Sequence, residues 1–308
     1  MCKENAVFNL SRVIHNQINN DDLKTFYIDF AEIAKSENEF IELLFDALVE
    51  FTFGIDAINI LSSQDIERFI DACEILYKEN RETKKEGDLG EVILHALLRD
   101  YLETLPFTGK IHFINDTGTP AKGFDIVHIT KDCKNLILGE SKMYGPFYKK
   151  GVLQEGIVVA KKALDNLAND IRTHFTIDYM KTKFILIEQK TKVDNIEVQI
   201  KMVNPVRDKL KEFKNILRKC KSIDELIDDI YVPLLCTYSS TLYNIKNQAL
   251  QVFIEDYSKE MECLEQYFKN KNIAVPQNLN IVLMFFPIPD KDRLIQKYYD
   301  KLKEINGK

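Results

Sequence analysis

Residues 135–142, which read NLILGESK, decide the fold. Three aliphatic residues precede Gly139, and Glu140 and Lys142 follow it at a spacing of two. The aliphatic run predicts a buried strand, and side chains two apart in a strand leave the same face of the sheet. We therefore expect the Glu140 carboxylate and the Lys142 ammonium to lie side by side at the end of this strand.

The neighbouring segments place two more acidic residues in apolar surroundings. Residues 122–127 (KGFDIV) predict a second strand with Asp125 at its start. Residues 86–102 predict a helix with apolar side chains on two sides, which is typical of a helix buried between layers, and Glu91 lies on it. Uncompensated charges are costly in such places, so both acids are candidates to meet Glu140.

The rest of the chain alternates strand and helix patterns, which favours an α/β fold with a mixed central sheet flanked by helices. Two late strands are apolar on both faces, as strands inside a covered sheet are. We expect strands at 26–33, 110–114, 124–129, 135–139, 183–188, 231–238 and 279–286. We expect helices at 38–51, 63–77, 86–102, 153–171, 205–220, 222–229, 247–270 and from 290 onward.

The 308 residues fall into three predicted regions. The charged segment at 79–86 (ENRETKKE) marks a boundary between a mixed, mostly helical region at 1–80 and a core at 81–200. Residues 201–308 are predicted to form an α/β region. This region could extend the core sheet or fold by itself, and we expect it to extend the sheet. No repeat with a period of 20 to 50 residues interrupts this order.

Charge and motif content exclude several classes of protein. The formal net charge is −6, from 48 acidic and 42 basic residues, which is not the composition of a small basic nucleic-acid binder. The chain has no GxxxxGK[ST] loop, so we expect no ATP hydrolysis by it, and no GxSxG motif of an α/β hydrolase.

Six cysteines without a CxxC pair indicate free thiols in a reducing compartment. The first five residues form no apolar signal segment, and the uncharged run at 230–245 is too short and too polar to cross a bilayer. We therefore predict a cytoplasmic protein with no membrane partner.

Two basic stretches are candidate phosphate-contacting surfaces, although each pattern also fits a solvated helix face. The first stretch has two lysine pairs, Lys149 with Lys150 and Lys161 with Lys162. The second runs through 209–221 and precedes acidic residues at 224–229. Salt dependence of binding would distinguish the two interpretations.

Two carboxylates beside a lysine are what metal-dependent phosphodiester cleavage needs. Mg²⁺ binds through one or two carboxylates and keeps several waters. The ion lowers the pKa of an attacking water, and the lysine stabilises charge on the phosphate oxygens. A helix carboxylate such as Glu91 can support the ligands or a second ion. A structural interpretation fits the same residues equally well. In it, Glu140 and Lys142 form an ion pair at the strand end, and Asp125 accepts hydrogen bonds from turn amides.

Three motifs together resemble the PD-(D/E)xK nuclease superfamily, and more narrowly the HamA family of Hachiman antiphage defence effectors. They are 87–91 (GDLGE), 122–125 (KGFD) and 139–142 (GESK), within a resemblance that covers roughly residues 50–300. The resemblance implies a restriction-endonuclease-like fold and Mg²⁺ as cofactor, with Mn²⁺ as a possible substitute. It implies that Asp125, Glu140 and Glu91 hold the metal and that Lys142 is the catalytic lysine.

The same resemblance implies a partner and leaves three functions open. HamA proteins work with HamB, a superfamily-2 helicase that engages DNA and controls the nuclease. The leading hypothesis is a metal-dependent DNA nuclease that is active with this helicase. The alternatives are a weak or inactive nuclease-fold module that regulates the helicase, and a sequence-specific restriction endonuclease that forms homodimers.

Two residues show where the resemblance is incomplete. Related nucleases carry Gln-x-x-x-Tyr on the next helix, whereas here Gln154 is followed by Val158. His95 stands four residues after Glu91 and fits either a metal site or, more commonly, a packed core position.

Overall fold

The computed structural model describes residues 7–29, 32–54, 64–83, 87–107, 109–110, 124–132, 134–176, 230–244, 249–274 and 279–307. The strand predicted at 183–188, the helices predicted at 205–220 and 222–229, and the basic stretch at 209–221 lie outside these residues. Of the strand predicted at 110–114, only Lys110 is described.

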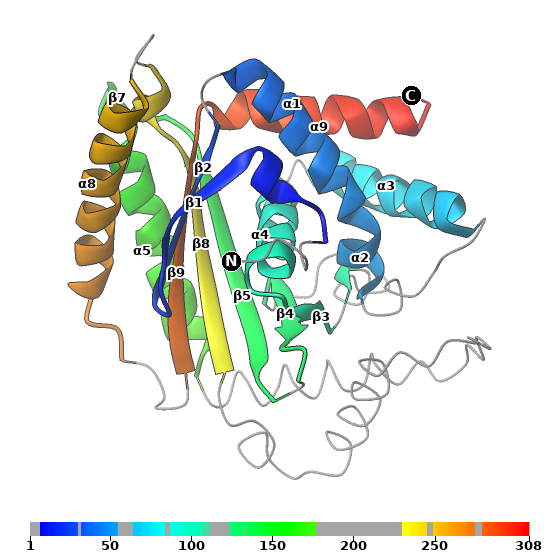
Figure 1. Cartoon of the computed structure of the whole chain (residues 1–308), viewed down its shortest axis with the longest axis horizontal. Helices are drawn as coiled ribbons and strands as arrows, with labels where there is room; N and C mark the ends of the chain where they lie inside the picture. The colour runs from blue at the N-terminus through cyan, green and yellow to red at the C-terminus, as the bar shows by residue number, and fades with distance from the viewer. Residues whose placement is uncertain are drawn as a thin grey trace.

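A mixed sheet of seven strands forms the centre of the molecule, in the order β1-β2-β9-β8-β5-β4-β3 (Figure 1). Strands β2, β9, β8 and β5 are parallel to one another, β1 pairs antiparallel with β2 at one edge, and β4 and β3 follow β5 in antiparallel pairs at the other. The strands are β1 (Ile14–Asn19), β2 (Leu23–Ile28), β3 (Leu105–Pro106), β4 (Ile126–Ile129), β5 (Leu136–Tyr144), β8 (Ile230–Ser239) and β9 (Leu279–Ile288).

Helices cover both faces of this sheet, and each face has its own apolar core (Figure 1). One core contains α5 (Ile157–His174) and α8 (Leu250–Lys269). The other contains α1 (Ile33–Asp46), α2 (Leu48–Phe53), α3 (Gln64–Thr83), α4 (Gly87–Tyr101) and α9 (Lys291–Ile305). The predicted α/β class, a mixed sheet flanked by helices, is confirmed.

Short elements complete the described fold. They are the 3-10 turns η2 (Leu10–Arg12) and η6 (Thr241–Asn244), and a hairpin of β6 (Phe147–Lys149) and β7 (Val152–Gln154). The long helix predicted from 153 therefore begins later, at Ile157, because the hairpin occupies the residues before it.

Strands from all three predicted regions pair within the one sheet. The late strands β8 and β9 were predicted from their two apolar faces, and they lie beside β5 and β2 in parallel register. Strand β1 was not predicted, because it lies at an edge and alternates buried with exposed residues in a largely polar segment. The division of the chain into three regions, with boundaries near residues 80 and 200, stays a prediction.

The described helices include none with the length and hydropathy needed to cross a membrane.

Candidate functional site

Pairing of β4 with β5 brings Asp125 beside Glu140. Ile126 is opposite Gly139 in the antiparallel register, and the Asp125 amide donates to the Gly139 carbonyl at 3.1 Å. The Asp125 Oδ2 atom accepts hydrogen bonds from the Ser141 amide at 2.8 Å and the Ser141 hydroxyl at 3.3 Å. Asp125 is therefore held against β5 by both backbone and side chain.

Two glycines allow α4 to approach β5 closely. A Cβ atom at Gly139 would come within 2.9 Å of Leu94 on α4, and one at Gly90 would come within 3.3 Å of the Ser141 hydroxyl. The glycines in the motifs at 87–91 and 139–142 thus have a packing role, because they bring the first turns of α4 over the middle of β5.

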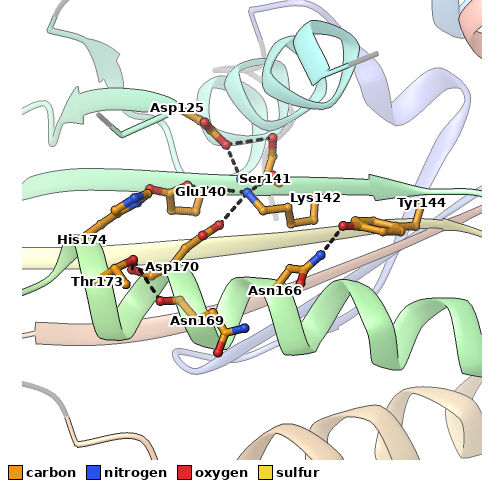
Figure 2. Close-up of polar contacts among 10 residues, drawn as sticks. All are labelled: Asp125, Glu140, Ser141, Lys142, Tyr144, Asn166, Asn169, Asp170, Thr173 and His174. Carbon is orange, nitrogen blue, oxygen red and sulfur yellow. Dashed lines mark hydrogen bonds and ion pairs between the residues drawn. The ribbon is translucent and has the colours of Figure 1, made fainter. Parts of the chain in front are cut away.

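On the opposite face of β5, three alternate side chains meet three side chains of α5 (Figure 2). Two residues of a strand span about 6.6 Å, and four residues of a helix span about 6 Å, so successive pairs keep in step. We call this set the polar ladder. Its rungs are Glu140 with His174, Lys142 with Asp170, and Tyr144 with Asn166.

Ion pairs and hydrogen bonds hold the first two rungs together. The His174 Nδ1 atom lies 2.9 Å from Glu140 Oε1, and the Lys142 Nζ atom lies 2.6 Å from Asp170 Oδ2. Lys142 Nζ is also 4.0 Å from Glu140 Oε2 and donates to the Ser141 carbonyl at 3.2 Å. The predicted neighbours Glu140 and Lys142 therefore share one face, as the spacing of two indicated.

Electrostatics couple these groups to Asp125. Burial raises the pKa of Glu140 well above its usual range, and the charge of Asp125 raises it further, against the opposing effect of Lys142. Burial alone would lower the pKa of Lys142, but the carboxylates of Asp125, Glu140 and Asp170 raise it above its usual value. The site therefore keeps a lysine cation among carboxylates that repel one another.

Glu91 lies near this cluster but is bound to another residue. Its Oε2 atom is 2.5 Å from Lys110 Nζ, which is also 3.3 Å from Asp88 Oδ1. Burial raises the pKa of Glu91 well above its usual range, Lys110 opposes the rise, and Asp125 adds to it. The structure thus brings Asp125, Glu140 and Lys142 together and places Glu91 at their border, in an ion pair with Lys110.

Two residues of the site, Asp170 and His174, were missed from the sequence. A signal for them existed, since 166, 170 and 174 repeat at a spacing of four along the helix whose apolar face was recognised. The sequence does not tell which strand this polar stripe contacts, because that depends on how the helix packs on the sheet.

Two other candidates lie away from the site. Gln154 is in β7 and not on the following helix, and its Nε2 atom donates to the carbonyls of Val152 and Leu153. His95 is buried in the α4 core, where its Nδ1 atom is 3.0 Å from His128 Nε2. His95 is therefore a packed core residue, which was the commoner of its two interpretations.

The donors suit a hard cation that keeps most of its waters. Among the described residues, no three His, Cys, Asp or Glu side chains are arranged to hold a metal ion. The adjacent carboxylates Asp125 and Glu140 fit Mg²⁺, which needs only one or two protein carboxylates. A bound cation would offset both effects that raise the pKa of Glu140, its burial and the charge of Asp125. Glu91 as a third ligand stays a prediction.

Fold and site together define an α/β protein whose central sheet carries a cluster of carboxylates around one lysine. The chain belongs to the HamA family, because the sequence model of that family matches residues 5–302. Membership in this family gives the chain a role in antiphage defence. No curated protein and no solved structure matches it.

Proposed function

We propose that the chain is a metal-dependent DNA nuclease of the PD-(D/E)xK type and the effector of a two-component antiphage system. One observation carries the proposal. Lys142 Nζ lies 4.0 Å from the buried Glu140 carboxylate, on a strand to which Asp125 is fixed by a hydrogen bond of 2.8 Å. This is the acid-and-lysine arrangement that phosphodiester hydrolysis uses.

Asp125 and Glu140 are the residues that would hold Mg²⁺, with Mn²⁺ as a possible substitute. When bound, the ion polarises the phosphate and lowers the pKa of the attacking water. His174 on α5 orients the Glu140 carboxylate for this role, because its Nδ1 atom lies 2.9 Å from Glu140 Oε1.

Lys142 stabilises the charge that develops on the phosphate oxygens. It is suited to this task because the surrounding carboxylates raise its pKa and keep it cationic. Asp170 holds the Nζ atom at 2.6 Å and so fixes where the positive charge lies. One side of this pair is open to solvent, since the Lys142 and Asp170 side chains are 25% and 22% exposed.

A helicase of the HamB type is the proposed partner that delivers DNA. The chain itself is acidic, with a net charge of −6, and attracts a polyanion only through local basic surfaces. A nuclease that is toxic to its host benefits from this dependence, because the strand reaches the site only when the partner presents it. The proposed setting is the cytoplasm.

Two substitutions test the mechanism in the complex with the helicase. Glu140→Ala removes a metal ligand, so we expect loss of Mg²⁺-dependent DNA cleavage by about 100-fold or more together with weaker metal binding. Lys142→Ala removes a cation and not a ligand, so cleavage should fall by a similar factor while calorimetry shows metal affinity equal to wild type or slightly higher.

Exposed residues outside the site and the hairpin provide matched controls. Glu262→Ala and Lys134→Ala remove the same charges from the surface and should leave cleavage unchanged. Melting temperature and co-purification with the helicase check that each variant folds and assembles. Cleavage that persists in excess EDTA, or in both site variants, would contradict the proposal.

One observation favours a second function, a nuclease-fold module that regulates the helicase without cutting. Glu140 and Lys142 already have partners on α5, so a purely structural ladder is chemically complete. In that case wild-type protein would bind no Mg²⁺ at this site. The same two alanine variants would alter helicase activity or leave it unchanged, with no cleavage to lose.

A further inference from the structure

The β6–β7 hairpin presents an aromatic and a cationic group to solvent directly after β5. Tyr148 is 74% exposed, and its neighbours Lys149 and Lys150 are exposed as well. The turn has positive φ at Lys150 (52°) and Gly151 (79°), which is the conformation of a tight two-residue hairpin turn. Positive φ is uncommon outside glycine. The turn therefore has one specific backbone conformation, and this conformation places Lys150 at the tip of the hairpin.

The same end of the molecule also carries a concentration of lysines. Lys149, Lys150, Lys161 and Lys162 lie within sixteen residues, 147–162, that contain a single acid, Glu155. Among the described residues, no carboxylate pairs with any of these four lysines. Many exposed lysines elsewhere are paired instead, as in Lys35 with Glu32, Lys78 with Glu74, Lys131 with Glu103 and Lys269 with Glu265.

The polar ladder leads from the candidate site to this basic surface. One helical turn beyond Asn166, the Lys162 Nζ atom lies 3.9 Å from the centre of the Phe147 ring and 5.5 Å from that of Tyr144. This contact is a fourth step in the same series and joins α5 to the hairpin. Three steps of about 6.5 Å separate it from Glu140, a path of ~20 Å. Figure 1 shows β7 at the end of the molecule where α5 begins.

We propose that the β6–β7 hairpin and the first turns of α5 bind single-stranded nucleic acid, with a base stacked on Tyr148 and phosphates on the four lysines. An unstacked base can cover an exposed aromatic ring, whereas the bases of a duplex are already stacked on each other. The inference rests on the proposed function in one respect, that the bound strand continues along the ladder to Lys142.

Binding of a fluorescent oligothymidylate to the full chain in EDTA tests this surface without cleavage. Tyr148→Ala should raise the dissociation constant about tenfold and leave its salt dependence unchanged, because stacking carries no charge. The double substitution Lys149→Gln with Lys150→Asn should reduce the slope of log affinity against log salt by about 1.4, since each lost phosphate contact on a single strand contributes about 0.7. Asn is chosen at 150 because it tolerates positive φ.

Matched controls come from exposed residues on helices of the other sheet face. Ile66→Ala removes an exposed apolar side chain, and Lys35→Gln removes a lysine that has a partner, so both should bind as wild type does. A duplex of the same length should bind more weakly than the single strand and respond less to Tyr148→Ala. Melting temperature confirms that the hairpin variants fold.

Several results would overturn the inference. Wild-type protein that fails to bind the oligonucleotide at low salt is one, and hairpin variants that bind as wild type are another. Loss of helicase association with unchanged oligonucleotide binding would show that the hairpin is a protein-docking surface instead.

Failure of the proposed function gives a different pattern. Glu140→Ala should bind the oligonucleotide as wild type does in EDTA. If binding depends on the hairpin but wild type never cleaves with Mg²⁺, the nuclease proposal fails and the binding surface stands. If wild type cleaves but neither binding nor cleavage depends on the hairpin, the surface fails alone.

Discussion

Two polar clusters beside the sheet differ in how their charges balance. On the α4 face, the Arg99 guanidinium pairs with Glu50 at 2.6 Å and 3.2 Å, and two neutral imidazoles complete the group. In the second cluster, Glu140, Lys142 and Asp170 meet on the α5 face, and the carboxylates of Asp125, Glu140 and Asp170 surround this single lysine. We call these the core cluster (Glu50, His95, Arg99, Thr104, His128) and the site cluster (Asp125, Glu140, Lys142, Asp170, His174).

Solvent access separates the clusters as clearly as charge does. His95 is 1% exposed and Arg99 is 6% exposed, while Lys142 is 25% exposed and His174 is 23% exposed. A closed and balanced cluster stabilises the fold and offers nothing to a ligand. An open cluster with surplus carboxylates attracts a cation and admits a substrate. The comparison therefore predicts that stability depends on the first cluster and activity on the second.

The largest expected effect is loss of stability from Arg99→Ala. Removing one partner of a buried ion pair leaves Glu50 without its cation and costs about 3–5 kcal/mol of the free energy of unfolding. The Thr104 carbonyl also loses the hydrogen bond that it accepts from Arg99. Urea unfolding would measure the change.

Arg12→Ala is the matched control, because Arg12 forms an ion pair with Glu39 at the surface. Exposed pairs contribute at most about 1 kcal/mol. If Arg99→Ala lowers the free energy of unfolding by as little as Arg12→Ala does, the core cluster does not stabilise the fold as proposed.

A second, smaller effect is the pH dependence of stability that the core histidines create. Burial, with the charge of Arg99, lowers the pKa of His95 well below its usual value, and burial likewise lowers that of His128. The unfolded chain therefore binds more protons than the folded chain below pH ~6.5, and stability falls as pH drops from there toward the folded pKa values.

Each core histidine should contribute a slope that grows below pH ~6.5 toward a limit of about 1.4 kcal/mol per pH unit. Melting temperature followed from pH 8 to pH 5.5 measures the slope, which His128→Gln should reduce and His15→Gln, at an exposed position on β1, should not. Equal slopes in all three proteins would show that the histidines are not held neutral.

The smallest effect concerns how Lys142 is positioned. Asp170→Asn keeps an oxygen near Lys142 Nζ but removes a carboxylate charge, so we expect cleavage by the complex to fall about tenfold, equivalent to about 1.4 kcal/mol. Melting temperature should change little. Asp165→Asn on the same helix, where the aspartate accepts from Tyr267 at 2.9 Å, is the control.

Metal affinity completes this test, since Asp170 is a positioning residue and not a proposed ligand. It should stay near the wild-type value in the Asp170→Asn variant. Cleavage that stays at the wild-type level would indicate that the rung between Lys142 and Asp170 has no part in catalysis.

Local patterns in the sequence determined the elements with strong periodicity. The aliphatic strands β5, β8 and β9 and the helices α4, α5 and α8 were all predicted, with ends that differ by a few residues. The spacing of two also determined that Glu140 and Lys142 share a face, because alternation along a strand is a property of the backbone alone. Polar edge strand β1 escaped prediction, since its pairing with β2 and not its composition makes it a strand.

Only the tertiary structure decided what lies opposite each of these side chains. The register of β4 against β5 sets Asp125 beside Glu140, and the packing of α5 sets Asp170 and His174 against the same strand. The partner of Glu140 on α5, His174, is 34 residues away in sequence. Periodicity determines the direction in which a side chain points. Contacts between residues so far apart in sequence depend instead on the order of the strands in the sheet and on the packing of the helices. The same packing leaves Glu91 with Lys110 and encloses His95 in the core.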